Sequence, residues 1–568
     1  MEFISHLKER KVFQTLAVYL GTGWVAVEAL AFFSEKYGWP QNIIDVIILA
    51  IFFGLPSALV HAWFHGQAGK QKVKKREMVL HSVVGVIACV FIFNSLKNPP
   101  TSGPPPGEAE DHSIAILPLE VLSEDESNKY FADGVTEAIR GHLGKIGNLK
   151  VTSRNSVEQY RGTEKRAPEI AEEIGVRHIL TGSFQRHEDQ IRIMVQLVDA
   201  QTDKQLWAET FDRLYNDVLE LQSDIALQIA SQLDIQLNVL VKDRINKRSV
   251  NNVEAYNLYL KGQYSVKTAV GSDLELQKAI VYYQEAIALE PDFALAWAAI
   301  ANAYMYQTYW GRAASSEVLP SAIEAVDKAL SIDKEAGECY QAKGMVSFFN
   351  LEFNLAIEHF QRAIDLNPNH AEAYFWLAHT YHVIGDLGLS MNNMDKAIEL
   401  DPVSLFYPIS RAYILTSSRE FAQAEEVLMN VLKTNDDSHA KWMLGHNYAN
   451  SGKYEEAIKT LQERKGGSAN NWILGYVYGK SGKTEDAEKV LDYLVEKNKN
   501  GYAPPYMIAI LLISLDRKEE ALDWLEKGLK DGPVFSYIVE INGPKLAPLK
   551  NEPRFKTLVG KFTGQGPS

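Results

Sequence analysis

Cysteine is scarce in this sequence: Cys89 and Cys339 are the only two among 568 residues. Cys89 lies in an apolar segment and Cys339 in a segment with helical repeat spacing, so we do not expect them to pair. The sequence therefore predicts neither a disulfide framework nor a cysteine-based metal site. It also leaves the redox state of the surrounding compartment undecided.

Positive charge is scarce over most of the chain. The whole sequence has 58 Lys and Arg against 72 Asp and Glu, a net charge of −14. Residues 1–100 hold ten of the basic and six of the acidic side chains, so the remaining residues carry 48 against 66, a net charge of −18. A nucleic-acid-binding surface needs clustered Lys and Arg to displace counterions. We therefore expect no nucleic acid among the partners.

Residue arrangements typical of catalytic sites are also missing. No Ser/His/Asp order, carboxylate pair or metal-binding motif occurs in a supporting context. Ser481–Thr484 reads SGKT, like the end of a phosphate-binding loop, but Val477 stands where the first glycine is required. We therefore predict that the protein is not an enzyme and has no catalytic residues, no bound cofactor and no metal.

Long apolar runs are present in the first 100 residues. Each has about the 20 residues that a helix needs to cross a bilayer. Three transmembrane helices are therefore predicted, at about residues 12–33, 43–64 and 78–96. Two polar residues, Glu28 and His61, fall within these runs, and we favour packing or an interfacial position for both over a functional role in the membrane.

Basic residues flank the predicted helices unevenly. Lys8, Arg10 and Lys11 precede the first, and five Lys or Arg lie within Lys70–Arg76, between the second and third. The positive-inside rule places both segments in the cytoplasm. The expected location is a bacterial inner membrane, with a cytoplasmic N-terminus and a periplasmic chain after about residue 97.

A proline-rich linker is predicted at residues 101–111, followed by a small α/β domain at 112–240. Apolar and alternating runs predict its strands and helices. The strands are expected at 113–119, 149–152, 178–185, 191–197 and 205–213, and the helices at 135–143, 168–174 and 217–233. Asp133 is expected to cap the first helix rather than to act in catalysis. Ser153–Ser156 has residue types that hold an anion at a helix start, but it lacks a glycine-rich loop.

A 34-residue unit occurs twice between Glu335 and Pro402. Ala363 and Ala397 are 34 residues apart, and so are Pro368 and Pro402. This period, with small residues in mid-helix and a closing proline, is typical of stacked helix–turn–helix pairs, and the units resemble the tetratricopeptide repeat. We predict eight units over residues 253–532, an insertion of about nine residues at 311–319, and a capping segment at 533–568.

The α/β segment carries a second resemblance. SIAILPLEVLSEDESNKYFADGVTEAI and IAEEIGVRHILTGSFQRHEDQIRIMVQLVDAQTDKQLWAETFD are similar to the TolB-like amino-terminal domain, most specifically through Phe131-Ala-Asp-Gly and Gly182-Ser-Phe. In many bacterial membrane proteins this domain precedes tetratricopeptide repeats. Its relatives include sensor halves of membrane-integrated transcription activators and accessory regions of adenylate cyclases. About eleven residues precede the first apolar run here, so we expect neither a DNA-binding nor a cyclase domain.

The repeat resemblance implies that the first helix of each unit lines a concave groove. Aromatic, methionine and polar side chains on that face suit a peptide or a partner helix, although each is as well explained by packing. The expected partner-binding residues are Glu338, Gln341, Met345, Phe348, Glu372, Phe375, His379 and His382. The two histidines are three residues apart, a spacing that could share a metal, but no third ligand is evident and a solvated face is favoured.

The predicted fold class is therefore multi-domain, with a three-helix membrane block, a small α/β domain with a mixed sheet, and an all-α tetratricopeptide-repeat solenoid. The predicted function is a membrane-anchored interaction scaffold or signal-input module. It would bind a protein or peptide through the repeat groove, the α/β domain or both, with the lipid bilayer as a second partner and homo-oligomerisation left open. The alternatives are a non-catalytic regulatory subunit of a membrane enzyme such as an adenylate cyclase, and a cell-envelope enzyme with an unrecognised site.

Overall fold

The computed structural model describes residues 112–122, 126–268, 273–463, 471–532, 535–541 and 543–562, and ten positions between residues 15 and 76. The chain divides into two compact units, Met1–Pro106 and Gly107–Ser568. The three predicted membrane helices, with Glu28 and His61, lie outside the described residues apart from those ten positions. The second unit contains every element discussed below.

The expected inner-membrane location is contradicted. Within the described ranges, no helix combines the length and the apolar character needed to cross a bilayer. The strongly apolar helix α24 (Pro505–Ser514) has ten residues and is roughly 15 Å long, half of what a bilayer requires. Helix α5 (Glu126–Gly144) is longer, with 19 residues, but charged side chains occur along it. The predicted periplasmic location of the chain after about residue 97 depended on the same three helices, so it is not supported either.

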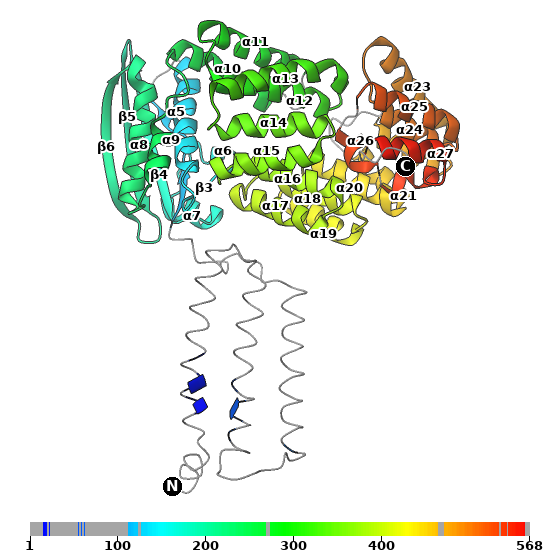
Figure 1. The fold of residues 1–568 in the computed structure, drawn as a ribbon, viewed down its shortest axis with the longest axis horizontal. Coiled ribbons are helices and arrows are strands. Elements are labelled where there is room, and N and C mark those ends of the chain that lie inside the picture. Colours follow the sequence, from blue (N-terminus) through cyan, green and yellow to red (C-terminus); the bar gives the residue numbers. More distant parts are fainter. Residues whose placement is uncertain are drawn as a thin grey trace. The chain divides into compact units, whose positions relative to one another are not determined.

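A mixed sheet opens the second unit (Figure 1). Strand β1 lies parallel between β3 and β4, and β4, β5 and β6 continue as an antiparallel meander, in the order β3-β1-β4-β5-β6 with β2 paired to β4. The strands are β1 (Ser113–Ile116), β2 (Glu120–Val121), β3 (Lys150–Val151), β4 (His178–His187), β5 (Gln190–Asp199) and β6 (Lys204–Leu214). All five predicted strands are present.

Helices cover both faces of the sheet, because alternate residues of the buried strand β1 point to opposite sides. Ile114 and Ile116 pack with α5 and α8 (Val218–Gln232), whereas Ala115 packs with α6 (Arg154–Glu158) and α7 (Ala167–Ile174). The short elements β2, α6 and α9 (Val239–Asn246) were not predicted, because so few residues show no clear period.

Asp133 does not cap a helix. Helix α5 begins seven residues earlier, at Glu126, so Asp133 lies on its face. Its carboxylate accepts hydrogen bonds from Arg154, at 2.9 Å, and from Arg161, at 2.7 Å. The predicted capping role is therefore wrong, and Asp133 instead joins α5 to the segment that contains α6.

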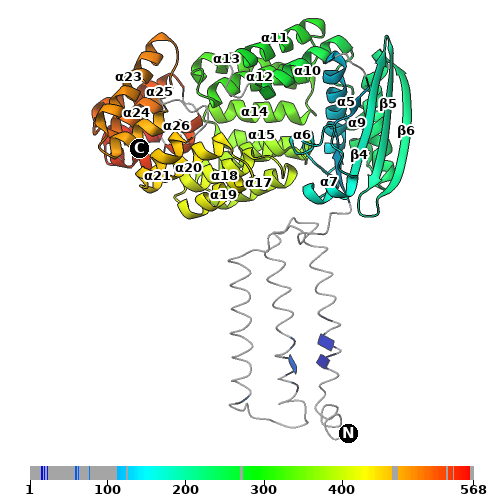
Figure 2. The same ribbon diagram turned by 180° about the vertical axis from the view of Figure 1, so that it is seen from behind.

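Eight antiparallel helix pairs follow in the part of the chain that the structure describes (Figure 2). They are α10 (Val253–Thr268) with α11 (Asp273–Leu289), α12 (Ala294–Tyr309) with α13 (Ser315–Ile332), α14 (Gly337–Phe349) with α15 (Phe353–Leu366), α16 (Ala371–Ile384) with α17 (Leu387–Leu400), α18 (Phe406–Ser417) with α19 (Phe421–Thr434), α20 (Ser438–Ser451) with α21 (Tyr454–Gln462), α22 (Trp472–Lys480) with α23 (Thr484–Asn500), and α24 with α25 (Lys518–Lys530). Small residues permit their close packing: a Cβ on Gly344 would lie 2.4 Å from the Phe360 ring.

The α/β layer is fastened to the repeat array by polar side chains of the array. Asn369, between α15 and α16, accepts a hydrogen bond from the backbone N–H of Val151 at 2.9 Å and donates to the carbonyls of Gly144 and Leu149. Asp401, just after α17, accepts from the Ser156 hydroxyl at 2.6 Å. The predicted anion-holding segment Ser153–Ser156 thus binds a carboxylate of the same chain.

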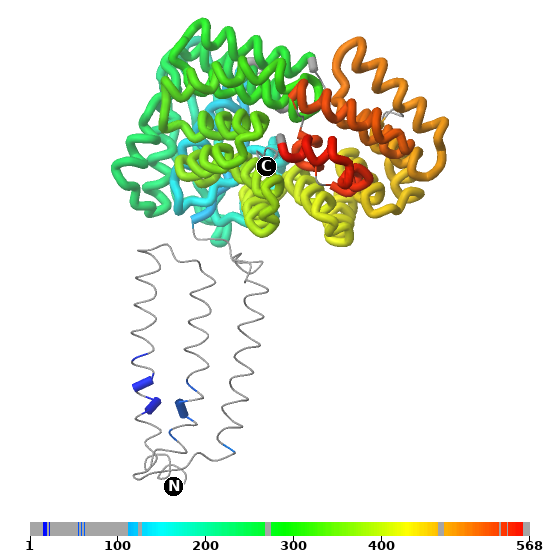
Figure 3. Tube along the Cα trace, turned by 45° about the vertical axis from the view of Figure 1, so that its right-hand side comes forward, coloured from blue at the N-terminus to red at the C-terminus, as the bar shows by residue number. Residues whose placement is uncertain are grey.

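The chain ends with α26 (Phe535–Glu540), a 3-10 helix η2 (Pro544–Leu549) and α27 (Pro553–Phe562). Helix α27 packs on α25 at the end of the array, in the manner of a cap. Helix α26 instead contacts α12 and α16, which belong to much earlier pairs. Figure 3 shows these C-terminal helices, in red, between the green and the orange parts of the array.

Candidate partner-binding face

The first helices of successive pairs are neighbours, so their inward side chains form one continuous surface. Contacts run from α12 to α14 and on through α16, α18, α20, α22 and α24. We call the part of this surface that meets the C-terminal segment the inner face. Its aromatic and histidine side chains are Tyr309, Phe348, Trp376, His379, Tyr413, His446 and Tyr506.

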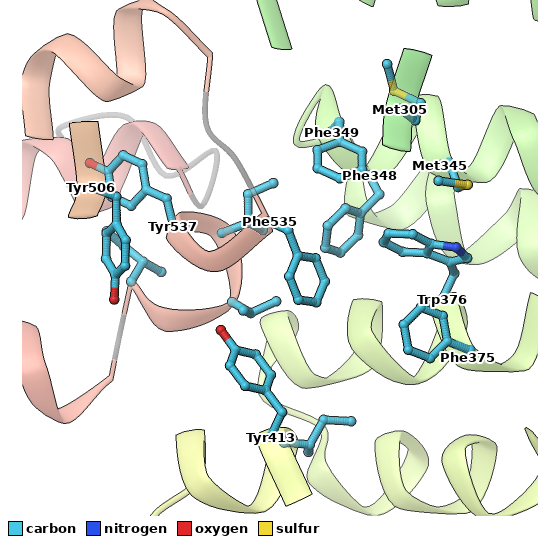
Figure 4. Close-up of a cluster of buried hydrophobic side chains, with 14 of the residues drawn as sticks. Met305, Met345, Phe348, Phe349, Phe375, Trp376, Tyr413, Tyr506, Phe535 and Tyr537 are labelled. Carbon is cyan, nitrogen blue, oxygen red and sulfur yellow. The ribbon is translucent and has the colours of Figure 1, made fainter. Parts of the chain in front are cut away.

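Phe535 is the anchor of the C-terminal segment on the inner face. Five rings from four different helices surround it, and only 9% of its surface is exposed. The ring centroids lie 4.7 Å away for Tyr309, 4.9 Å for His379, 5.9 Å for Trp376, 6.0 Å for Tyr413 and 6.2 Å for Phe348. In Figure 4, Phe535 lies between Phe348 and Tyr413. An aromatic side chain is therefore what this part of the inner face binds.

Glu540 lies five residues further along the segment and is buried with polar partners. Its carboxylate accepts hydrogen bonds from the hydroxyls of Tyr413, at 2.8 Å, and Tyr506, at 2.7 Å. The ammonium of Lys545 lies 3.0 Å from the same carboxylate. Burial alone would raise the pKa of Glu540, but the adjacent Lys545 ammonium and the hydrogen bond from Tyr506 hold that pKa well below its usual value. Glu540 is therefore ionised at neutral pH.

Lys545 is almost fully buried and uses all three of its N–H donors. They reach His446 Nε2 at 2.5 Å, Asn450 Oδ1 at 3.0 Å and Glu540 at 3.0 Å. Burial and the adjacent ammonium lower the pKa of His446, so the imidazole is neutral and accepts from Lys545 through Nε2. Burial lowers the pKa of Lys545, and the adjacent Glu540 carboxylate opposes that shift. Glu540 and Lys545 thus form a buried ion pair, and both belong to the C-terminal segment.

Three of the predicted partner-binding residues meet the C-terminal segment. Phe348 and His379 contact the Phe535 ring, and His382 hydrogen-bonds the backbone of Val539. Burial lowers the pKa of His382 to about 4 and that of His379 well below its usual value. The solvated-face interpretation of this histidine pair is therefore corrected, because the C-terminal segment covers it. Among the described residues, no group of three or more His, Cys, Asp or Glu is arranged to hold a metal ion.

The other five predicted residues bind elsewhere in the array. Phe375 packs against Phe406 and Tyr407 of the next first helix. Met345 is buried and its sulfur accepts from Gln341, which in turn accepts from Asn302 at 2.8 Å. Glu372 accepts a hydrogen bond from Tyr306. Glu338 faces the α/β layer: burial lowers the pKa of Lys145, directly after α5, and the charge of Glu338 opposes that shift.

Sequence reasoning missed the main components of this face. Tyr309, Trp376, Tyr413, His446 and Tyr506 were not selected, although each lies on a first helix. The available signal was the segment FSYIVEI at 535–541, which is too apolar for an exposed cap. Six of its seven side chains proved to be buried, with Ser536 the exception.

The predicted insertion near residues 311–319 touches the other end of the array. The backbone N–H of Ser316 donates to the carbonyl of Asp531 at 3.2 Å, and its hydroxyl donates to the same oxygen. A Cβ on Gly311 would lie 2.9 Å from Pro504, and one on Gly532 would lie 2.2 Å from the Ser315 hydroxyl oxygen. We call the Ser316–Asp531 contact the clasp. It fixes the chain immediately before the segment that enters the inner face.

Comparison with protein families identifies the helix pairs. A model described as "TPR repeat" matches residues 352–385, and one described as "Tetratricopeptide repeat" matches residues 371–404 and 438–463. The chain therefore contains tetratricopeptide repeats, as the 34-residue period predicted. Neither model covers the α/β layer, so the resemblance of that layer to TolB-like domains stays a prediction.

Curated relatives match only parts of the chain. A putative adenylate cyclase 3 of Rhizobium meliloti is 32% identical over 214 residues, 36% of each protein. A TPR repeat-containing protein of Methanocaldococcus jannaschii is 26% identical over 26% of this chain and 27% of its own length. The transcriptional regulator HilA of Salmonella paratyphi A is 18% identical over 55% of each. The chain thus spans between a quarter and about half of the length of these relatives.

Two solved structures align with parts of the chain at low identity. A tetratricopeptide repeat protein from Parabacteroides merdae is 16% identical, with a TM-score of 0.31, over 55% of this chain and all of its own. Pseudomonas aeruginosa pilF is 15% identical, with a TM-score of 0.27, over 36% of this chain and 90% of its own.

Proposed function

We propose that this protein is a non-catalytic interaction scaffold whose repeat array binds a protein partner through its inner face. The observation that carries the proposal is that the inner face already holds a peptide segment by an aromatic anchor and a carboxylate. Tetratricopeptide repeats bind segments of this kind with the first helices of successive units. The partner would therefore present a helical or extended segment rather than a folded surface.

We further propose that the α/β layer is a TolB-like signal-input domain. Its resemblance to that family supports this role, and so do its hydrogen bonds with Asn369 and to the Asp401 carboxylate, which join it to the turns beside α16 and α17. A ligand or protein that altered the layer would act directly on the repeats that hold Phe535. The two parts would then work as one module.

A photoreactive residue at a single position tests partner binding. We expect a photocrosslinking residue in place of His382, on the inner face, to capture the partner. The same residue in place of Leu355, which is 44% exposed on the second helix α15, is the matched control and should capture none. Capture from position 355 alone would contradict a role for the inner face.

One relative favours a second candidate function. The match to a putative adenylate cyclase supports a regulatory subunit of such an enzyme. Addition of the purified chain to an adenylate cyclase from the same organism would then change the rate of cyclic AMP formation. An unchanged rate over a range of chain concentrations would remove this candidate and leave the scaffold.

A further inference from the structure

The C-terminal segment 535–545, which we call the plug, contacts the repeat array as a bound ligand would, through its described residues 535–541 and 543–545. The side chains that hold Phe535 and Glu540 come from first helices of different pairs: α12, α14, α16, α18, α20 and α24. Neighbouring pairs also contact one another directly, as α15 contacts α16 and α19 contacts α20, without the plug between them. The plug is therefore an addition to the repeat architecture.

Two points of recognition define what the inner face accepts. The first is an aromatic ring in the position of Phe535, whose centroid lies 4.7 Å from that of Tyr309 and 4.9 Å from that of His379. The second is a carboxylate five residues later, which accepts hydrogen bonds from the hydroxyls of Tyr413 and Tyr506. Between them, Tyr537 stacks on Tyr506 with a centroid separation of 5.5 Å. The matching ligand is a short aromatic helix that ends in an acidic residue.

The plug can leave the inner face without leaving an unpaired charge buried in the array, because both members of its buried ion pair belong to the plug. Glu540 and Lys545 are paired at 3.0 Å and both belong to the plug. The groups that they leave behind are neutral: two tyrosine hydroxyls, the Asn450 amide and the His446 imidazole. A buried charge left without its partner would make release far more costly. Glu540 and Lys545 therefore leave the inner face together. A ligand that replaces them needs an acceptor for the two tyrosine hydroxyls and a donor for the imidazole nitrogen of His446.

The plug is attached on both sides to parts of the array that lie outside the inner face. The clasp between Ser316 and Asp531 precedes it. Leu546 and Leu549 of η2 are fully buried after it, and α27 packs on α25. Gly532, with φ of +86°, and Gly543 lie near its two ends. Release of Lys545 therefore requires the first turn of η2 to open, while Leu549 and α27 hold the chain beyond it.

We propose that the plug is an intramolecular pseudo-ligand, and that the partner of the inner face carries the same chemistry: an aromatic anchor followed about five residues later by a carboxylate. The inference rests on the proposed scaffold function. Partner binding is then an exchange, in which the incoming segment replaces Phe535 and Glu540. The affinity for the partner is set by how often the plug is out of its site.

A labelled synthetic peptide of residues 533–546, PVFSYIVEINGPKL, tests the exchange on the full chain. Phe535→Ala in the protein removes the intramolecular anchor, so the peptide should bind that variant at least about tenfold more tightly than the natural chain. A peptide with the same Phe535→Ala change should bind neither. Leu355→Ala is the control on the outer surface and should leave peptide affinity unchanged. Fluorescence anisotropy gives all the dissociation constants.

A second variant serves where Phe535→Ala lowers the yield of folded protein. Glu540→Gln keeps the shape of the plug but leaves Lys545 without its counter-charge, so it should also raise peptide affinity. Tyr413→Phe, added to either variant, removes a donor to the peptide carboxylate and should weaken binding several-fold. Equal affinity for the natural chain and both plug variants would overturn the inference, and so would binding that is indifferent to the peptide's aromatic anchor.

The two proposals fail in different ways. If the partner crosslinks at position 382 with the same yield in the natural chain and in Phe535→Ala, the scaffold function stands and the exchange is wrong. If the peptide exchanges as expected but no partner crosslinks at position 382 even in Phe535→Ala, where the plug's anchor is removed, the exchange chemistry stands and the scaffold function is wrong.

Discussion

The buried ammonium of Lys545 donates all three of its hydrogen bonds inside the protein, to His446, Asn450 and Glu540. Removal of one member of a buried ion pair leaves the other uncompensated. We expect Lys545→Met to lower the free energy of unfolding by about 3–5 kcal/mol, measured by urea denaturation. The double variant Glu540→Gln with Lys545→Met should recover part of that loss.

The exposed ion pair between Lys453 and Glu425, at 2.8 Å, is the control for this prediction. Lys453→Met should lower the free energy of unfolding by less than about 1 kcal/mol, because solvent already screens that pair. If Lys453→Met and Lys545→Met lower the free energy of unfolding by similar amounts, burial of the Glu540–Lys545 pair does not make its disruption more destabilising.

Burial of histidine gives the inner face a pH dependence. The pKa of His382 is lowered to about 4, and burial likewise lowers the pKa values of His379 and His446. The unfolded chain takes up protons on these side chains near pH 6.5, before the folded chain does. Stability should therefore fall as the pH drops from about 6.5 to about 4. His382→Asn should reduce the slope of the urea midpoint against pH in this window.

At the scale of single elements, several helix pairs depend on a glycine of the first helix that accommodates a large side chain of the second, as Gly262 accommodates Tyr283 and Gly445 accommodates Leu461. We expect Gly344→Ala to destabilise the array by about 1–3 kcal/mol, because its Cβ would lie 2.4 Å from the Phe360 ring. Gly388→Ala in α17 is the matched control. Its Cβ would approach nothing closer than 3.6 Å, so this change should be neutral or stabilising by up to about 1 kcal/mol. Thermal unfolding of both variants checks the contrast.

The helix pairs were predictable because their signal repeats. Ala363 with Ala397 and Pro368 with Pro402 report the same packing twice, so one unit supports the interpretation of the next. The strands β4, β5 and β6 were also predictable, since each has ten or more residues with an alternating or apolar pattern. Elements of this length carry their period within their own residues.

The plug was not predictable in the same way. Helix α26 has six residues, fewer than two turns, and its burial depends on Tyr309, Trp376 and Tyr413, far earlier in the chain. Phe348 and His379 contact Phe535 of the plug, and no local pattern could indicate that the chain's own C-terminal segment covers them. Their role in binding a separate partner stays a prediction.

At the scale of the whole second unit, Asn369 joins the α/β layer to the array through three hydrogen bonds. Asn369→Ala should lower the free energy of unfolding by about 2–4 kcal/mol, since it leaves backbone groups of the layer unpaired. The amide of Val151 loses its acceptor and should exchange with solvent faster, as hydrogen-exchange mass spectrometry would detect. Asn393→Ala, whose amide donates to Leu389 within its own helix α17, should leave that exchange unchanged.

The clasp changes how such an array comes apart. In an ordinary solenoid each repeat touches only its neighbours, so the terminal repeats separate first and unfolding proceeds inward. Here Ser316, at the start of the second helix of the second pair, holds Asp531, directly after the eighth pair, so a repeat near one end stabilises the other. The last pair therefore cannot fray by itself without also breaking a contact with the second. We therefore expect the last pair to open together with the second pair rather than before it.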